Sequence, residues 1–83
     1  MNNTLSLSEL VEGESGIVIG YDTNPPRKWG VMKRLIELGF IKNAEVSVEC
    51  IVHSTYKIKI KGQSNSYGIG KELIDRIYVR KIE

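Results

Sequence analysis

The chain has 83 residues, 12 of them Lys or Arg and 10 Asp or Glu, for a formal net charge of +2. We expect one domain over residues 1–83 with a single thin core, because a chain of this length buries only about 60% of its unfolded surface. A deep catalytic cleft between domains is therefore excluded. The charge is too small to indicate a nucleic-acid-binding protein by itself.

Cysteine content and hydropathy indicate the cellular compartment. Cys50 is the single cysteine, so an intramolecular disulfide is excluded and a reducing compartment fits. No apolar stretch approaches the ~20 residues of a membrane span, and the N-terminus lacks the charged and apolar regions of a signal peptide. We therefore expect a cytoplasmic protein that does not insert into a membrane.

The first elements along the chain are a short helix and a strand. Ser6 and Glu9 have the spacing of a capping box, which predicts a short N-terminal helix that Gly13 closes. Residues 15–21 are rich in β-branched side chains and precede a loop with two prolines, so they predict a strand.

A longer helix is predicted over residues 26–38. Pro26 suits the first helical turn, where its missing amide hydrogen costs nothing, and Gly39 is a typical C-terminal stop. This helix is too short to bury its apolar face alone, so the strands on either side must supply the surface on which it packs.

A β-hairpin follows the longer helix. Residues 45–52 and 56–61 both alternate apolar and polar side chains, which is the period of a half-buried strand. If residues 53–55 form the connecting turn, Cys50 lies opposite Ile58.

The C-terminal third predicts short elements. Residues 62–65 are expected to form a turn, 66–70 a short strand, 71–75 a single helical turn and 76–82 a last strand. Short strands with glycine at the bends suit a strongly curved sheet. We therefore predict a mainly β fold: a small SH3-like β-barrel of about five strands, with the longer helix between the first and second.

Metal, cofactor and catalytic sites are not expected. Cys50 and His53 are three residues apart and so point to opposite faces of a strand, and the chain has no other Cys or His to complete a metal site. The glycines at 68 and 70 before Lys71 lack the spacing of a phosphate-binding loop. The single His, the single Cys and the scattered carboxylates do not form a catalytic set of a nucleophile, a base and a third group that orients the base. We therefore predict a protein that is not an enzyme and holds no cofactor.

Cations on the last strands define a stripe that could contact phosphates. They are Lys57, Lys59, Lys61, Arg76, Arg80 and Lys81. Carboxylates interleave with them, and the available stacking partners are limited to Tyr67 and Tyr78. We favour a solvated face over a nucleic-acid partner, which stays as an alternative.

The longer helix has more apolar surface than one packing contact requires. At about 100° per residue its apolar residues form two stripes that together cover roughly 180°. One stripe is Val31, Leu35 and Leu38, and the other is Trp29, Met32 and Ile36.

The second stripe is either covered by the N-terminal helix or exposed for protein recognition. In the latter case the predicted partner-binding residues are Arg27, Lys28, Trp29, Met32 and Ile36. The same exposed arc could equally form a homo-oligomer.

Three blocks of the sequence resemble the FeoA family. They are LSELVEGESGIV at 7–18, RLIELGF at 34–40 and YGIGKELIDRIYV at 67–79, in the order and spacing of that family. Lys42-Asn43 replaces a common Pro-Gly, and asparagine can take the left-handed conformation that glycine would. The loop 22–28 is less typical, so the partner-binding residues above come from the apolar arc and not from the resemblance.

The resemblance implies a fold, a partner and a role. FeoA proteins have an SH3-like barrel with accessory helices and accompany FeoB, the membrane ferrous iron transporter whose cytoplasmic part binds and hydrolyses GTP. This chain would then be a cytoplasmic adaptor that binds the GTPase region of an FeoB-type transporter to promote its assembly or tune its GTP cycle. The same barrel is also the C-terminal domain of iron-dependent repressors, so a module that docks on a peptide or on a DNA-binding domain is a further alternative.

Overall fold

The strands form one continuous antiparallel sheet. The computed structural model describes residues 4–22 and 29–82. Its strands are β1 (Thr4–Ser6), β2 (Ser15–Tyr21), β3 (Glu45–Val52), β4 (Thr55–Ile60), β5 (Ser66–Gly70) and β6 (Ile77–Ile82). Its helices are the 3-10 helix η1 (Leu7–Glu9) and the α-helices α1 (Trp29–Leu38) and α2 (Lys71–Ile74).

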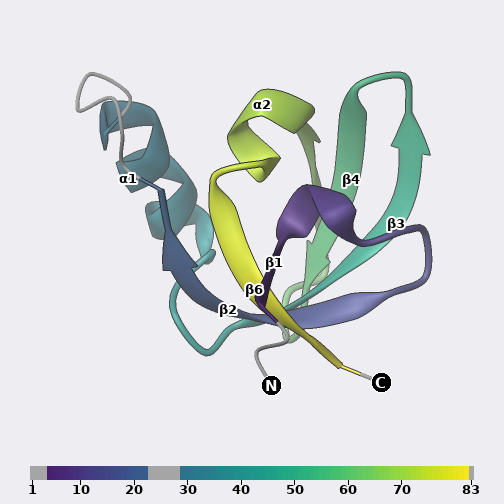
Figure 1. The fold of residues 1–83 in the computed structure, drawn as a ribbon, viewed down its shortest axis with the longest axis horizontal. Coiled ribbons are helices and arrows are strands. Elements are labelled where there is room, and N and C mark those ends of the chain that lie inside the picture. Colours follow the sequence, from purple (N-terminus) through teal and green to yellow (C-terminus); the bar gives the residue numbers. More distant parts are fainter. Residues whose placement is uncertain (1–3, 23–28, 83) are drawn as a thin grey trace.

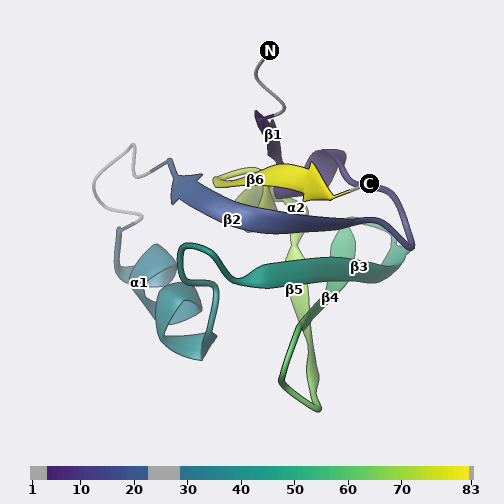
Figure 2. The same ribbon diagram turned by 90° about the horizontal axis from the view of Figure 1, so that it is seen from below.

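The sheet is strongly curved and has the order β1-β6-β2-β3-β4-β5. Figure 2 shows β6, β2 and β3 side by side, while β4 and β5 cross them, so the sheet wraps around its own interior. Figure 1 shows α2 beside β6 and α1 at the side of the barrel, away from the β3–β4 hairpin. The fold is the predicted small, mainly β, SH3-like barrel.

The strand β1 was not predicted from the sequence. It spans three residues and pairs with β6, with Thr4 opposite Arg80 and Ser6 opposite Tyr78. A strand this short has too few residues to display an alternating pattern. The sheet therefore has six strands where about five were expected, and α1 lies between β2 and β3.

The register of the β3–β4 hairpin differs from the predicted one. The loop has two residues, His53 and Ser54, because Val52 pairs with Thr55. His53 has a φ of 56°, the left-handed conformation that two-residue hairpin loops use. The register also shifts between Val48 and Cys50, which is a β-bulge.

The two-residue turn and the β-bulge together change which residues of β3 face inward. Cys50 lies opposite Lys57, not opposite Ile58 as predicted. Beyond the bulge Ile51 packs against the core, whereas Val52 is 57% exposed. The predicted pairing was wrong because it assumed a three-residue turn and a regular ladder.

The N-terminal helix is a single 3-10 turn without the predicted capping box. The Ser6 hydroxyl makes no capping hydrogen bond and instead donates to the backbone carbonyl of Asp75, at 3.1 Å. Leu7 and Leu10 are nevertheless fully buried. A tertiary contact with α2 therefore takes the place of the local cap.

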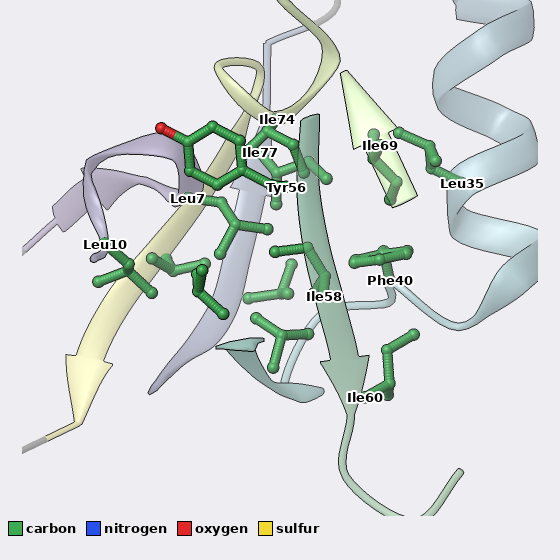
Figure 3. Packing of buried hydrophobic residues seen from close by; sticks show 14 of the residues in the cluster. Leu7, Leu10, Leu35, Phe40, Tyr56, Ile58, Ile60, Ile69, Ile74 and Ile77 are labelled. Carbon is green, nitrogen blue, oxygen red and sulfur yellow. The ribbon is translucent and has the colours of Figure 1, made fainter. Parts of the chain in front are cut away.

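The core is entirely apolar among the described residues. Figure 3 shows side chains from the strands, both α-helices and η1 meeting in one cluster. Its buried members are Leu7, Leu10, Val18, Met32, Leu35, Phe40, Val46, Val48, Tyr56, Ile58, Ile60, Ile69, Ile74, Ile77 and Val79.

Candidate functional site

The helix α1 buries one residue of each apolar stripe. Met32 is 0% exposed and Leu35 is 5% exposed, so the direction that faces the core lies between the stripes. Val31 and Leu38 are left on one flank, 41% and 38% exposed. The exposed apolar flank therefore belongs to the first stripe, whereas exposure for recognition was one of two alternatives for the second stripe.

The structure divides the predicted partner-binding residues. Arg27 and Lys28 lie outside the described residues, as does the side chain of Trp29, whose backbone begins α1. Met32 is a core residue, which corrects its assignment to an exposed patch, because it packs inward together with Leu35. Ile36 is half-buried.

An apolar groove of about 390 Å³ lies between α1 and β5. It is lined by Val31, Arg34, Leu35, Leu38, Ser66, Tyr67, Gly68, Ile69, Gly70 and Leu73. Figure 3 shows the side chains of Leu35 and Ile69 next to each other, on α1 and β5. Both are almost fully buried and form the floor of the groove, while the exposed flank of α1 forms one wall.

The C-terminal end of α1 is tied to the barrel by hydrogen bonds from two sides. The Tyr21 hydroxyl donates to the carbonyl of Phe40 at 2.5 Å, and the Gln63 side-chain amide donates to the carbonyl of Leu38 at 3.1 Å. The Tyr67 hydroxyl in turn donates to the Gln63 side chain at 2.7 Å. These contacts hold this wall of the groove at a set distance from β5.

Partial burial affects the ionisation of Tyr21. Because burial disfavours the charged phenolate, the pKa of the Tyr21 hydroxyl is raised above its ordinary value. The hydroxyl therefore stays protonated, and able to donate to Phe40, to a higher pH than the hydroxyl of a free tyrosine.

Among the described residues that line the groove, Arg34 is the one with a charge. Arg34 is exposed on α1, and no carboxylate in residues 4–22 and 29–82 forms an ion pair with it. An apolar groove with a single cation at its rim is suited to binding an apolar segment that carries a negative charge.

Of the predicted stripe of cations, Lys57 and Lys59 lie on β4 and Lys61 lies directly after it, whereas the other cations lie on or next to β6. Lys57 and Lys61 are exposed, and Lys59 is half-buried. Lys61 forms an exposed ion pair with Glu45 at 3.7 Å, and Tyr67 uses its hydroxyl within the protein. The lysine at the end of this row is therefore already paired with a carboxylate.

Among the residues that the structure describes, no group of three or more His, Cys, Asp or Glu side chains is placed to hold a metal ion. Cys50 is half-buried in β3 and His53 is exposed in the hairpin turn. Over the same residues, no helix has the length and apolar character needed to cross a membrane.

The sequence matches the family model of the FeoA domain over residues 5–81. The chain belongs to the FeoA family. Asn43, which stands where the family commonly has glycine, has a φ of 74°, so asparagine does adopt the left-handed conformation expected of it.

Solved structures of FeoA proteins have the same fold. The iron uptake regulatory protein FeoA superimposes with a TM-score of 0.78 at 26% identity, over 95% of this chain and 99% of that protein. A FeoA-like protein from Clostridium acetobutylicum has a TM-score of 0.81 at 18% identity, over 100% of this chain and 92% of that protein. No protein of curated function matches the sequence.

A manganese-dependent transcriptional repressor contains the same fold as one part of a longer chain. Its TM-score is 0.82 at 14% identity, and the match covers 99% of this FeoA-family chain but 43% of the repressor. Identity this low shows the fold alone.

Membership of the FeoA family supports a role in ferrous iron transport for this chain, as a small accessory protein. The groove was not predicted, because its two walls come from α1 and β5, which are about 30 positions apart in the chain, and no pattern in the sequence links them. The available signal was the seven-residue spacing of Val31 and Leu38, which places them on one flank of the helix.

Proposed function

We propose that this protein is a cytoplasmic accessory protein of ferrous iron transport that binds the cytoplasmic GTPase region of an FeoB-type transporter through protein–protein contacts. Membership of the FeoA family supports the assignment to ferrous iron transport. The observation that carries the proposal is the apolar groove beside the exposed flank of α1. No catalytic step is assigned to the protein.

The flank is suited to a partner contact because it leaves apolar area unburied. Val31 and Leu38 are each about two-fifths exposed, at 41% and 38%. Covering such a side chain in an interface stabilises the complex by roughly 1 kcal/mol, at about 25 cal/mol per Å² of apolar area. With the groove floor beneath them, they would form the apolar centre of a small interface.

The test is a binding titration of the purified GTPase region against wild-type protein and two variants. Val31→Glu and Leu38→Gln place polar groups on the flank, and we expect each to weaken binding at least tenfold, or ~1.4 kcal/mol. Both positions are exposed, so the thermal midpoint should change by only a few degrees.

Val52→Glu is the matched control, because it makes the same change at a 57% exposed valine at the end of β3. It should bind like the wild type. Equal binding by all variants would place the contact surface elsewhere, and no binding by the wild type would overturn the proposed function.

A second candidate, a docking module like part of a metal-dependent repressor, is compatible with the shared fold. The third, nucleic-acid binding through Lys57, Lys59 and Lys61, predicts an affinity that falls steeply with salt, because phosphate binding releases counterions. Apolar docking depends little on salt. Titration with duplex DNA at two salt concentrations separates the third candidate from the other two.

A further inference from the structure

We propose that the free edge of β5 pairs with an extended segment of the partner, which adds a strand to the sheet and lies in the groove beside α1. The segment has apolar side chains at alternate positions and an acidic residue near Arg34. The proposal rests on the proposed function for the source of the segment, but its binding chemistry comes from β5 itself.

The position of β5 in the sheet leaves one side of its backbone unpaired. It is the last strand in the order β1-β6-β2-β3-β4-β5, so its only strand neighbour in the described chain is β4. An edge strand presents a row of N–H and C=O groups that can template another strand.

The register identifies which residues present those groups. The N–H of Lys71 donates to the carbonyl of Ser54 at 2.7 Å, next to the Thr55–Gly70 pair. This bond joins Ser54 and Lys71, which lie directly opposite each other, so the adjacent pair Thr55–Gly70 is a non-hydrogen-bonded pair. Hydrogen-bonded and non-hydrogen-bonded pairs alternate along an antiparallel ladder. The backbone groups of Ser66, Gly68 and Gly70 therefore point away from β4. Those of Ser66 and Gly68 and the N–H of Gly70 can pair with an added strand, while the Gly70 carbonyl, at the N-cap of α2, accepts the first bond of that helix.

At Gly68 and Gly70, β5 has no side chain of its own that could cover these groups. Gly68 and Gly70 are both exposed, and a Cβ built at Gly70 would meet nothing within 4 Å. Natural edge strands are commonly protected by lysine, proline or a bulge. The sequence Ser-Tyr-Gly-Ile-Gly of β5 contains no lysine and no proline. Its pairing with β4 has no register shift, so there is no bulge either.

The groove runs along this same edge. All five residues of β5 line it, and the opposite wall comes from α1. Figure 3 shows Ile69 between Ile58 of β4 and Leu35 of α1, so α1 stands on the unpaired side of β5. Alternate side chains of an added strand would face the apolar floor, since a strand has a period of two.

Backbone pairing together with side-chain pockets is a general mode of peptide recognition. Here β5 supplies the backbone groups, the floor and the α1 flank supply apolar contacts, and Arg34 supplies one positive charge without a carboxylate partner in the described chain. The charge favours an acidic residue in the segment over a basic one.

The decisive variants are Gly68→Pro and Gly68→Ala. Proline removes the outward N–H and places its ring on the edge, without touching the bonds to β4. Alanine adds a Cβ, which would lie in ordinary contact with Thr55 at 3.5 Å, and keeps the N–H. No positive φ marks Gly68, so alanine is compatible with its backbone. Proline additionally fixes φ at about −65°, so circular dichroism is used to check that Gly68→Pro folds.

The first probe is a capped nine-residue peptide that alternates valine and threonine, with one threonine replaced by aspartate. Amide chemical shifts of labelled protein are followed during titration. We expect shifts on Ser66, Gly68 and Gly70 in the wild type and Gly68→Ala, and at least tenfold weaker binding by Gly68→Pro. A peptide with lysine in place of aspartate should bind more weakly.

The second probe is the GTPase region of an FeoB-type transporter. Protection of the Ser66, Gly68 and Gly70 amides from hydrogen exchange in the wild-type complex gives a readout that needs no variant, in case Gly68→Pro does not fold. If the region binds and neither Gly68→Pro nor exchange at these amides responds, the proposed function stands and the β5 inference is overturned.

The remaining outcomes are also decisive. Failure of the GTPase region to bind, with the peptide still pairing on β5, would reject the proposed partner and keep the edge site. Silence with both probes would reject both proposals. Shifts on β5 that depend on protein concentration alone would identify a second copy of the chain as the occupant and overturn the inference.

Discussion

Asp75 links two parts of the chain that are far apart in sequence. Its carboxylate accepts a hydrogen bond from the Ser8 hydroxyl and pairs with Lys71 at 3.2 Å, and its backbone carbonyl accepts from Ser6. The Ser8 hydrogen bond, followed by Lys71, lowers the pKa of the Asp75 carboxyl below its ordinary value of 3.8. These contacts connect η1 and the end of α2.

Replacing Ser8 by alanine tests the largest of these contributions. We expect Ser8→Ala to lower the free energy of unfolding at pH 7 by about 1 kcal/mol, the usual net value of a hydrogen bond. Because the pKa of Asp75 is lowered in the folded state, this stability is present above its ordinary pKa of 3.8. It is lost as the pH falls through the lowered folded-state pKa.

Urea denaturation of both proteins from pH 7 to pH 2 measures the difference. Lys71→Gln is the control, since the side chains of Lys71 and Asp75 are 53% and 44% exposed and solvent screens their ion pair. A Ser8→Ala effect that stays constant down to the lowest pH would mean that the hydroxyl acts through packing and not through the carboxylate.

The same residues explain a local prediction that was wrong. Ser6 and Glu9 have the spacing of a capping box, but Ser6 donates to a carbonyl 69 positions later in the chain. A local pattern contains no information about a distant carbonyl that competes for the same hydroxyl. The burial of Leu7, by contrast, followed from its apolar character.

Among the elements, α1 has glycines with opposite expected effects. Gly30 lies within the helix, and a Cβ there would meet nothing within 4 Å. Gly39 follows the helix with a φ of 127°, and a Cβ there would overlap the side-chain nitrogen of Gln63. That nitrogen is the donor to the carbonyl of Leu38.

Alanine at these two positions should therefore change stability in opposite directions. Gly30→Ala is expected to stabilise the protein by up to about 1 kcal/mol, the difference in helix propensity. Gly39→Ala is expected to destabilise it by about 1–3 kcal/mol, because a side chain is strained at this φ. Thermal and urea unfolding of both variants would check this, and a stabilising Gly39→Ala would contradict the described end of α1.

Element positions were more predictable than element pairing. The bounds of β2, β3 and β5 follow from β-branched or alternating residues flanked by glycine or polar turns. The hairpin register did not, because the bulge after Val48 and the two-residue turn at His53 each shift the pairing. Several registers satisfy the same alternation, and only packing on the core selects one.

At the scale of the whole molecule, Phe40 joins α1 to the barrel. Its side chain is fully buried, and its ring lies 6.1 Å from that of Tyr67, tilted by 58°. The residue comes directly after Gly39, so the same position anchors the end of α1 and fills the core next to Leu35.

Phe40→Ala is expected to lower the free energy of unfolding by about 3–5 kcal/mol, the usual loss for a buried phenylalanine. This is a large part of the roughly 5–15 kcal/mol typical of a small domain. Denaturant unfolding should show a lower midpoint with an unchanged slope. Ile41→Ala, at a neighbouring residue that is 53% exposed, should change stability by no more than about 0.5 kcal/mol.

The candidate site was less predictable than the fold. The amphipathic character of α1 is visible in the sequence, yet which stripe faces inward depends on how α1 sits on the barrel. Met32 and Leu35 share the buried direction, so each predicted stripe lost one member to the core. The groove additionally needs β5 beside α1, an arrangement that only the folded sheet creates.

The sheet order also has a consequence for how the chain folds. The strand β6 lies between β1 and β2, so a strand near the end of the chain pairs on both sides with strands from its beginning. During synthesis on a ribosome, β1 and β2 would leave the exit tunnel first and could pair with β6 only after Ile82 had emerged. Pairings this distant in sequence slow folding, because the chain loses the entropy of loop closure before any stabilising contact forms. The barrel is therefore expected to form only after the whole of β6 has been synthesised.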